Sequence, residues 1–234
     1  MLSQAICVIA KDPLLGTELV LRGGTAYHKL FLPQPYRYSE DLDYVRTTSG
    51  GIGDVMKQLT ALSRELGYRV STKMGMYPKV IWRFEQASGT PGKIKIEVNT
   101  FERSPMLPLK TVAHAMESGY CSESAEVPTF QVEELVATKL RAIYQRSKGR
   151  DLYGLWLALT NLSIPPEAIV SAFPAYRPEG VTSEMMIENL KRKLSDKQFL
   201  HDMDPLIRQG APAYDPFEAG RLVTEKLLSR LDEK

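Results

Sequence analysis

The sequence predicts an α+β protein: a mixed or antiparallel sheet with flanking helices, followed by a helical C-terminal lobe. Before about Gln131, short apolar strands alternate with turns and one amphipathic helix, whereas helical periodicity dominates afterwards. With 234 residues, of which 43% are hydrophobic and 25% charged, the chain can bury a sizeable core. We therefore expect two lobes, residues 1–130 and 131–234.

Overall composition indicates the compartment of the protein but does not identify its partners. The formal net charge of +2 neither favours nor excludes nucleic acid. Cys7 and Cys121 are too few for a disulfide framework and lack metal-ligand spacing, which suits a reducing cytoplasm. The short apolar run at the N-terminus has no basic leader, and no window is long enough to cross a membrane. A cytoplasmic protein without a membrane partner is expected.

In the first lobe, turn signals and alternation define five strands. A strand enters Gly23-Gly24, and a helix from Thr25 should end before Pro33. Apolar residues at helical spacing predict an amphipathic helix from Ile52 to Leu66, which Gly67 stops. A turn at residues 87–92 joins the last two strands. The expected strands are 19–22, 37–46, 68–72, 79–85 and 93–99.

In the second lobe, helical periodicity recurs between turn-forming residues. Ser147-Lys148-Gly149 separates the first two helices, and Pro165-Pro166 opens the third. The expected helices are 132–145, 152–159 and 167–173, one around residues 187–194, and a last one around 223–231.

Asp41 and Asp43 stand two residues apart in a predicted strand, so both carboxylates should project from one face while Leu42 points to the other. Aspartate is depleted in strands, which makes an alternating pair costly unless something offsets it. Mg²⁺ would do so, because it binds carboxylate oxygens, water and phosphates. The alternative is a solvated strand end.

Glu97 is the candidate third carboxylate. Residues 93–98 alternate, which places three apolar side chains on the core and Glu97 on the opposite face with Lys93 and Lys95. If this strand neighbours the Asp41 strand, Glu97 completes a three-carboxylate metal site. A solvent-facing edge of alternating Lys and Glu is the other interpretation.

Gly23 and Gly24 lie at the change from strand to helix just before Thr25. Two glycines let backbone amides approach a phosphate, and a helix N-terminus adds partial positive charge. The pair is weak evidence by itself because most such pairs are simple turns, and no Walker lysine or dinucleotide fingerprint follows. The glycine pair is informative because it precedes the Asp-x-Asp strand by one helix.

This order of parts resembles the nucleotidyltransferase superfamily and, more narrowly, the AbiEii family, the toxins of AbiE/MenT-like type IV toxin–antitoxin systems. The resemblance spans about residues 19–156. It rests on Leu-Arg-Gly-Gly-Thr-Ala at 21–26, Arg-Tyr-Ser-Glu-Asp-Leu-Asp-Tyr at 37–44, Val-Glu-Glu-Leu-Val-Ala-Thr-Lys-Leu-Arg-Ala at 132–142 and Gly-Arg-Asp-Leu-Tyr at 149–153. Two features depart from the pattern: the interval from Gly24 to Asp41 is long, and Gly154 stands where a second Asp is expected.

The resemblance implies roles for residues of the basic segment 135–150, which holds five basic residues and no acidic one. It makes Lys139 a nucleotide-binding residue and Asp151 a catalytic one that accepts a proton from the incoming hydroxyl. Asp151 could equally cap a helix or pair with Arg150. Arg146, Lys148 and Arg150 are candidate RNA-backbone contacts, unless the segment is only a solvated helix face.

Ser39 and Thr25 complete the expected nucleotide site. Ser39 could contact phosphate or metal, although serine before an acidic strand more often bonds the local backbone. Together with Gly23, Gly24 and Lys139, these residues would hold the NTP.

The expected activity is transfer of a nucleoside monophosphate from an NTP to a hydroxyl, with pyrophosphate leaving and Mg²⁺ held by Asp41, Asp43 and Glu97. The catalytic lobe would be residues 1–130, and residues 131–234 would help to bind nucleotide and acceptor. The resemblance implies an RNA acceptor such as the tRNA 3′ end and a separately encoded antitoxin. Nucleotidylation of a small molecule or protein, or nucleotide and RNA binding without turnover, remain alternatives.

Overall fold

The computed structural model describes residues 1–86, 88–119 and 121–233 and confirms the α+β class. The chain forms two compact units. The first comprises residues 1–30 and 39–130, and the second comprises residues 31–38 and 131–234. The expected turn at 87–92 includes residue 87, which lies outside the described residues.

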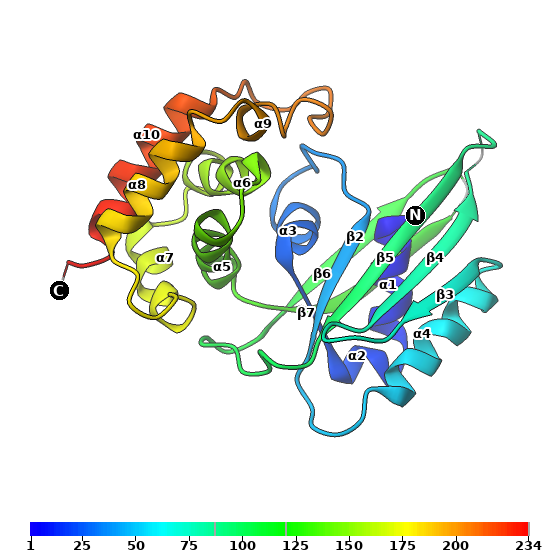
Figure 1. Ribbon diagram of the computed structural model, residues 1–234. Helices are drawn as coiled ribbons and strands as arrows, with labels where there is room; N and C mark the ends of the chain where they lie inside the picture. Colours follow the sequence, from blue (N-terminus) through cyan, green and yellow to red (C-terminus); the bar gives the residue numbers. More distant parts are fainter. Residues whose placement is uncertain (87, 120, 234) are drawn as a thin grey trace. The chain divides into compact units, whose positions relative to one another are not determined.

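The first unit contains a seven-stranded mixed sheet in the order β3-β4-β5-β2-β1-β7-β6 (Figure 1). Two neighbouring pairs, β2 with β5 and β1 with β7, are parallel, and the other pairs are antiparallel. The strands are β1 Leu19–Arg22, β2 Asp41–Arg46, β3 Arg69–Lys73, β4 Lys79–Glu85, β5 Pro91–Asn99, β6 Lys110–Glu117 and β7 Ser122–Thr129.

Helices α1 Leu2–Lys11, α2 Leu15–Glu18 and α4 Gly53–Glu65 contact one another and pack against strands of this sheet. Their apolar stripes are buried, as is the core-facing side of β4. Trp82 of β4 is fully buried and donates its indole N–H to the Leu59 carbonyl of α4 at 3.1 Å. A helix-to-sheet hydrogen bond therefore supplements apolar packing at the centre of the unit.

Glycine at the end of β1 leads into a short helix, α3 Gly23–Ala26, which continues as a π-helix, Tyr27–Phe31. The helix expected from Thr25 thus begins two residues earlier and ends before Pro33, as predicted. Its interior is tightly buried, with Ala26 and Tyr27 fully inaccessible to solvent.

The expected strand 37–46 is shorter than predicted, because β2 begins only at Asp41. Residues 31–38 belong to the second unit, where Arg37 forms a β-bridge with Ile207. Two backbone bonds flank this bridge: Tyr38 N to Leu206 O at 2.8 Å and Arg208 N to Tyr36 O at 3.0 Å. A long-range partner in the C-terminal region, which local periodicity cannot reveal, therefore separates Arg37 from the sheet.

The second unit is helical. Within it, α5 packs against α6, α7 and α8, and α10 packs against α6. The helices are α5 Val132–Gln145, α6 Gly149–Thr160, α7 Pro166–Ala172, η2 Phe173–Ala175, α8 Ser183–Lys193, α9 Lys197–Leu200, α10 Pro216–Lys226 and η3 Leu228–Arg230. Among the helices that the structure describes, none has the length and apolar character needed to cross a bilayer.

The alternation in β2 divides its side chains between the two faces of the sheet. Leu42 and Tyr44 are buried at 0% and 3% exposure, whereas Asp41 and Asp43 are partly accessible on the other face. The apolar side chains thus fix which face the carboxylates occupy, because a slip of one residue would bury both aspartates.

Replacing Leu42 by Ala should lower the free energy of unfolding by about 2–5 kcal/mol, since a fully buried side chain is lost and a cavity remains. Urea denaturation measures the change. Leu109→Ala, at a position 41% exposed, is the matched control and should change stability by about 0.5 kcal/mol or less. Equal losses in the two variants would contradict the assigned register.

Candidate active site

Three carboxylates meet on the partly open face of the sheet. Because β2 and β5 are parallel neighbours, Asp43 lies directly across from Glu97, and Asp41 lies across from Lys95. Arg22 of β1 lies across from Asp43 on the other side. We call Asp41, Asp43 and Glu97 the carboxylate cluster. The sequence predicted that Glu97 would join the two aspartates if the strands were neighbours, and the pairing confirms this neighbourhood.

Asp43 is the electrostatic centre of the cluster. Burial is the largest cause that raises the pKa of its carboxyl, and the nearby charges of Glu97 and Asp41 raise it further. Arg22 and Lys95 act in the opposite direction without cancelling the shift. The ionised form of Asp43 is therefore disfavoured in the cluster, and added positive charge would stabilise it.

Two lysines on neighbouring strands each contact one oxygen of a cluster carboxylate. Lys95 Nζ lies 3.2 Å from Asp41 Oδ2, and Lys79 Nζ lies 2.8 Å from Glu97 Oε2. The hydrogen bond to Glu97 is the largest cause of the raised pKa of Lys79. Lysines thus flank the cluster on β4 and β5, while the carboxylates of Glu97 and Asp43 face each other directly across β5 and β2.

The donor set fits a hard divalent cation such as Mg²⁺, because the cluster offers carboxylate oxygens and the positive charges near Asp43 do not cancel the rise of its pKa. Within the described ranges, no three His, Cys, Asp or Glu side chains are grouped closely enough to hold a metal ion. The chemistry of the cluster thus suits a cation, although its side-chain positions do not preassemble the site.

The glycine turn packs directly against the cluster. Gly23 has a φ of +77°, and a Cβ placed on it would lie 2.6 Å from Asp43 Oδ2. Both the left-handed backbone and the close approach require glycine at this position. Gly24 follows in the first turn of α3.

Thr25 ties this turn to the start of β2. Its hydroxyl donates to the Asp41 carbonyl at 2.6 Å and lies 2.7 Å from Ser39 Oγ. Since the single hydroxyl hydrogen of Thr25 is used on Asp41, Ser39 donates to Thr25. The two predicted nucleotide-binding hydroxyls thus contact each other, and Thr25 is buried at 3% exposure.

In the second unit, Asp151 is buried and held by Arg146. Arg146 donates from Nε to Oδ2 at 2.7 Å and from Nη2 to Oδ1 at 2.8 Å, which is a bidentate pair. Lys139 Nζ lies 3.9 Å from Asp151 Oδ1. Burial alone would raise the pKa of Asp151, but the hydrogen bonds from Arg146 and the charge of Lys139 lower it overall. The carboxylate is therefore ionised at neutral pH.

Gly154 has a clear structural role beside Lys139. A Cβ on Gly154 would lie 2.7 Å from Cε and 2.9 Å from Cδ of Lys139. The lysine stem therefore passes directly over the glycine in the α5–α6 contact, and Lys139 is only 7% exposed. The position where the resemblance suggested an acidic residue instead provides the space that Lys139 occupies.

The basic segment does not continue as one helix, because α5 ends at Gln145 and α6 begins at Gly149. The break falls at the expected separator Ser147-Lys148-Gly149, so Lys139 and Arg150 lie on different helices. Asp202 accepts the Arg150 backbone N–H at 3.2 Å and lies 3.8 Å from Lys148 Nζ.

Lys193, on α8, binds the end of α5 where the chain breaks between α5 and α6. Its ammonium donates to the carbonyls of Ile143, Tyr144 and Arg146. It therefore satisfies carbonyls that the end of α5 leaves without helical partners. Burial lowers the pKa of Lys193 to about 8, although the charge of Asp151 opposes that shift.

Sequence reasoning did not assign roles to Arg22, Lys79, Lys95 or Lys193. Lys95 had a visible signal, because it alternates with Glu97 on the same face. Arg22 and Lys79 acquire meaning only through strand register, and Lys193 only through the docking of α8 on α5.

The structure thus groups the carboxylate cluster with Gly23, Gly24, Thr25 and Ser39 in the first unit, and groups Lys139, Asp151 and the three basic residues Arg146, Lys148 and Arg150 in the second. A strand, a glycine turn, an Asp-x-Asp strand and a carboxylate on the parallel neighbour are the parts, in order, that the sequence predicted for a nucleotidyltransferase. Residues 7–221 match the model of the family described as nucleotidyl transferase AbiEii toxin, type IV toxin–antitoxin system. The chain belongs to this family.

Two solved structures have a similar fold. JHP933 from Helicobacter pylori aligns with a TM-score of 0.59 at 15% identity, covering 99% of this chain and 91% of that one. MenT4, the nucleotidyltransferase toxin Rv2826c from Mycobacterium tuberculosis H37Rv, aligns with a TM-score of 0.64 at 16% identity, covering 99% and 82%. A comparison with curated protein sequences gives no significant match.

Asp43→Asn should stabilise the protein at neutral pH. The pKa of Asp43 is raised in the folded protein, so ionising this carboxyl lowers the free energy of unfolding. The loss is absent at a pH below the ordinary pKa of aspartate. It grows as the pH rises through the raised pKa. The variant should therefore be more stable than wild type near pH 7 and equally stable at about pH 3.

Denaturant titrations across this pH range test the expectation. Asp54→Asn is the matched control, since that side chain is 82% exposed and should show no comparable gain. A stability difference at Asp43 that is constant with pH would refute the assigned electrostatics.

Proposed function

We propose that the protein transfers a nucleoside monophosphate from an NTP to a hydroxyl of an RNA acceptor, such as the 3′ end of a tRNA, and releases pyrophosphate. Membership of the AbiEii family supports nucleotidyl transfer by a toxin. The carboxylate cluster carries the proposal, because its three acidic side chains share one face, where burial and the charges of Glu97 and Asp41 raise the pKa of Asp43. RNA as the acceptor is taken from the family resemblance.

Asp41, Asp43 and Glu97 would hold Mg²⁺. The ion would supply charge that neutralises the transferring phosphate and the leaving pyrophosphate. The supporting observation is the raised pKa of Asp43, which burial, Glu97 and Asp41 cause and which Arg22 and Lys95 do not cancel.

The phosphates of the donor would be held by Gly23, Gly24, Thr25, Ser39 and Lys139. Gly23 brings backbone to within contact of Asp43, so a phosphate bound at the turn would lie beside the cluster. The hydrogen bonds from Thr25 to Asp41 and Ser39 fix the turn relative to β2. The contacts of Thr25 and Ser39 thus position the backbone amides of the turn and add no charge.

Asp151 would accept the proton of the attacking hydroxyl. Arg146 keeps this carboxylate ionised, but it also weakens it as a base and occupies both oxygens, so Arg146 must move away before Asp151 can accept a proton. The Arg146 side chain is 55% exposed, so it has room to turn outward. Arg146, Lys148 and Arg150 would then contact acceptor phosphates, which require charge but no base identity.

Type IV toxin–antitoxin membership implies an antitoxin partner. We propose that it is encoded separately and that the protein acts in the cytoplasm, where NTPs and tRNA are available.

Purified protein incubated with Mg²⁺, each labelled NTP and total tRNA should label the RNA. Asp41→Ala should reduce labelling by roughly 100-fold or more, because removing even an outer partner of a metal ligand commonly costs 10–100-fold. Asp54→Ala, at an exposed site, should keep full activity.

The alternatives give different results in the same assay. Label that persists in Asp41→Ala would refute the assigned centre. Label only on protein or on a small molecule would replace the RNA acceptor, and a complete absence of label would favour a nucleotide- or RNA-binding module.

Gly154→Ala should weaken NTP binding as Lys139→Ala does. The added methyl group displaces the flexible end of Lys139, while alanine is favoured over glycine in a helix by roughly 1 kcal/mol, so the fold should persist. The KM for NTP should rise on the order of tenfold in each single variant.

The double variant Lys139→Ala with Gly154→Ala should be no worse than Lys139→Ala, because both changes remove the same contact. Additive losses would show that Gly154 acts independently of Lys139. Circular dichroism and urea denaturation establish that each variant is folded.

A further inference from the structure

The open side of β3, β4 and β5 carries three cations in one line. Arg69 of β3 lies directly across from Arg83 of β4, and Arg83 lies directly across from Lys93 of β5. All three residues are exposed. We call them the cation row. At the usual spacing between strands, the row extends about 10 Å across the sheet.

Like charges directly opposite each other on neighbouring strands destabilise a sheet, so this row carries a folding cost that nearby groups only partly offset. Lys93 Nζ lies 3.2 Å from Glu40 Oε2, with both side chains more than half exposed, and Arg83 donates to Ser71 Oγ at 2.6 Å. In the described part of the chain, no ion pair joins Arg69 or Arg83 to a carboxylate.

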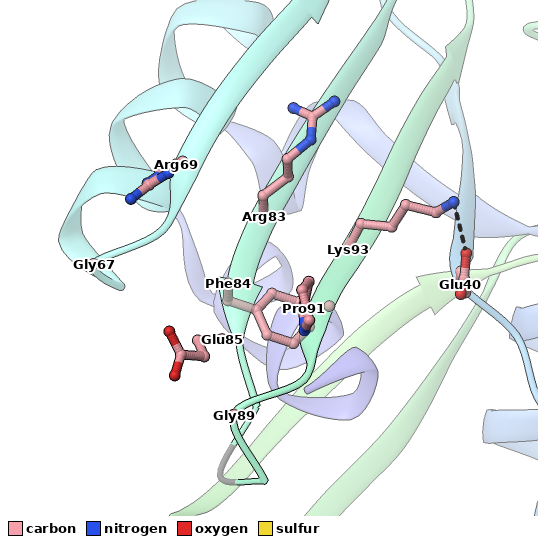
Figure 2. A pocket seen from close by; sticks show the side chains of 10 residues that line it. Glu40, Gly67, Arg69, Arg83, Phe84, Glu85, Gly89, Pro91 and Lys93 are labelled. Atoms are coloured by element: carbon pink, nitrogen blue, oxygen red, sulfur yellow. Dashed lines mark ion pairs between the residues drawn. The ribbon is translucent and has the colours of Figure 1, made fainter.

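The row borders a hollow of about 600 Å³, whose lining also includes Phe84 and Glu85. Figure 2 shows Arg83 and Lys93 on adjacent strands and the single ion pair from Lys93 to Glu40. The strand register fixes the order and the backbone positions of the three residues, so a ligand would meet the three cations side by side.

The cation row and the carboxylate cluster lie on the same face of the sheet. Lys93, Lys95 and Glu97 alternate along β5 with the buried Ile94 and Ile96. The four residue steps from Lys93 to Glu97 correspond to about 13 Å along the strand. An extended ligand held at the row could therefore reach the cluster within a few of its units.

We propose that the cation row binds the phosphate backbone of the RNA acceptor and leads its reactive end to the carboxylate cluster. This inference rests on the proposed function, and it adds acceptor contacts in the first unit to those proposed for Arg146, Lys148 and Arg150. It assigns backbone contacts to Arg69, Arg83 and Lys93, which give affinity without reading sequence.

The observations favour RNA over an acidic protein segment. A nucleic acid carries one negative charge at each regular backbone step, which suits three cations placed in a line across neighbouring strands. The row also shares its face with the proposed reacting centre, to which an acceptor must extend. An acidic polypeptide remains a distinguishable outcome of the test.

Binding of a short, 5′-labelled single-stranded RNA to the full chain, followed by fluorescence anisotropy without NTP, tests the row separately from catalysis. The triple variant Arg69→Ser, Arg83→Ser and Lys93→Ser should bind roughly tenfold more weakly at low salt. Its slope of log affinity against log salt should be shallower by about 2, because three single-strand phosphate contacts are lost.

The matched control is Lys57→Ser, Arg64→Ser and Lys191→Ser, which removes the same charge at exposed residues of α4 and α8. It should bind RNA with nearly the wild-type slope. Equal effects in the two triple variants, or none in either, would overturn the proposal. Competition by polyglutamate as strong as that by unlabelled RNA would overturn it in favour of an acidic protein partner.

Transfer assays keep this result separate from the proposed function. RNA binding through the row without any transfer of label would leave the row in place and refute the nucleotidyl transfer. Transfer with an unchanged KM for RNA in the row variant would leave the transferase in place and refute the row.

Discussion

The parallel pairing of β2 with β5 is the constraint on which the candidate site depends. It places Asp43 directly across from Glu97, which are 54 positions apart in the sequence, and brings Asp41 beside Lys95. The register is enforced from the opposite face, where Leu42, Tyr44 and Ile96 are buried against helices. The packing that buries these apolar side chains therefore also brings together, on the other face of the sheet, carboxylates that repel one another. The packing of the core, and not a contact within the carboxylate cluster, offsets the free-energy cost of ionising Asp43. This pattern is expected where binding chemistry takes precedence over stability.

Local patterns in the sequence were sufficient to predict the helices and strands that bury one face in the hydrophobic core. The alternation at 93–98 placed Glu97 on the correct face, and the spacing from Ile52 to Leu66 located α4, because burial imposes a period that can be read directly. The same logic missed α1, β6 and β7. Exposed and partly exposed residues alternate along β6 with few large apolar side chains, so its strand character depends on pairing with β7. The overlong strand prediction at 37–46 failed for a related reason, since Arg37 pairs with Ile207.

The candidate site was predictable as a set of residue types but not as a set of contacts. The order of Gly23, Asp41, Asp43 and Glu97 indicated the chemistry, and the family match agrees with it. What the sequence could not give was the state of each side chain: Thr25 and Ser39 bonded to each other, Arg146 clamped on Asp151, and Lys193 closing the end of α5. Such contacts depend on which elements pack together, and each changes how readily its residue can meet a ligand.

The close contact of Lys139 with Gly154 links two positions 15 residues apart into one steric unit. A relative with aspartate at the position of Gly154 could not hold a lysine along this path, since every side chain other than glycine begins with the Cβ that collides. In such a relative the lysine must run elsewhere, or a shorter residue must replace it. The identity of one residue therefore decides how the other should be interpreted, and the two positions should be compared as a pair, never singly, when members of the family are aligned.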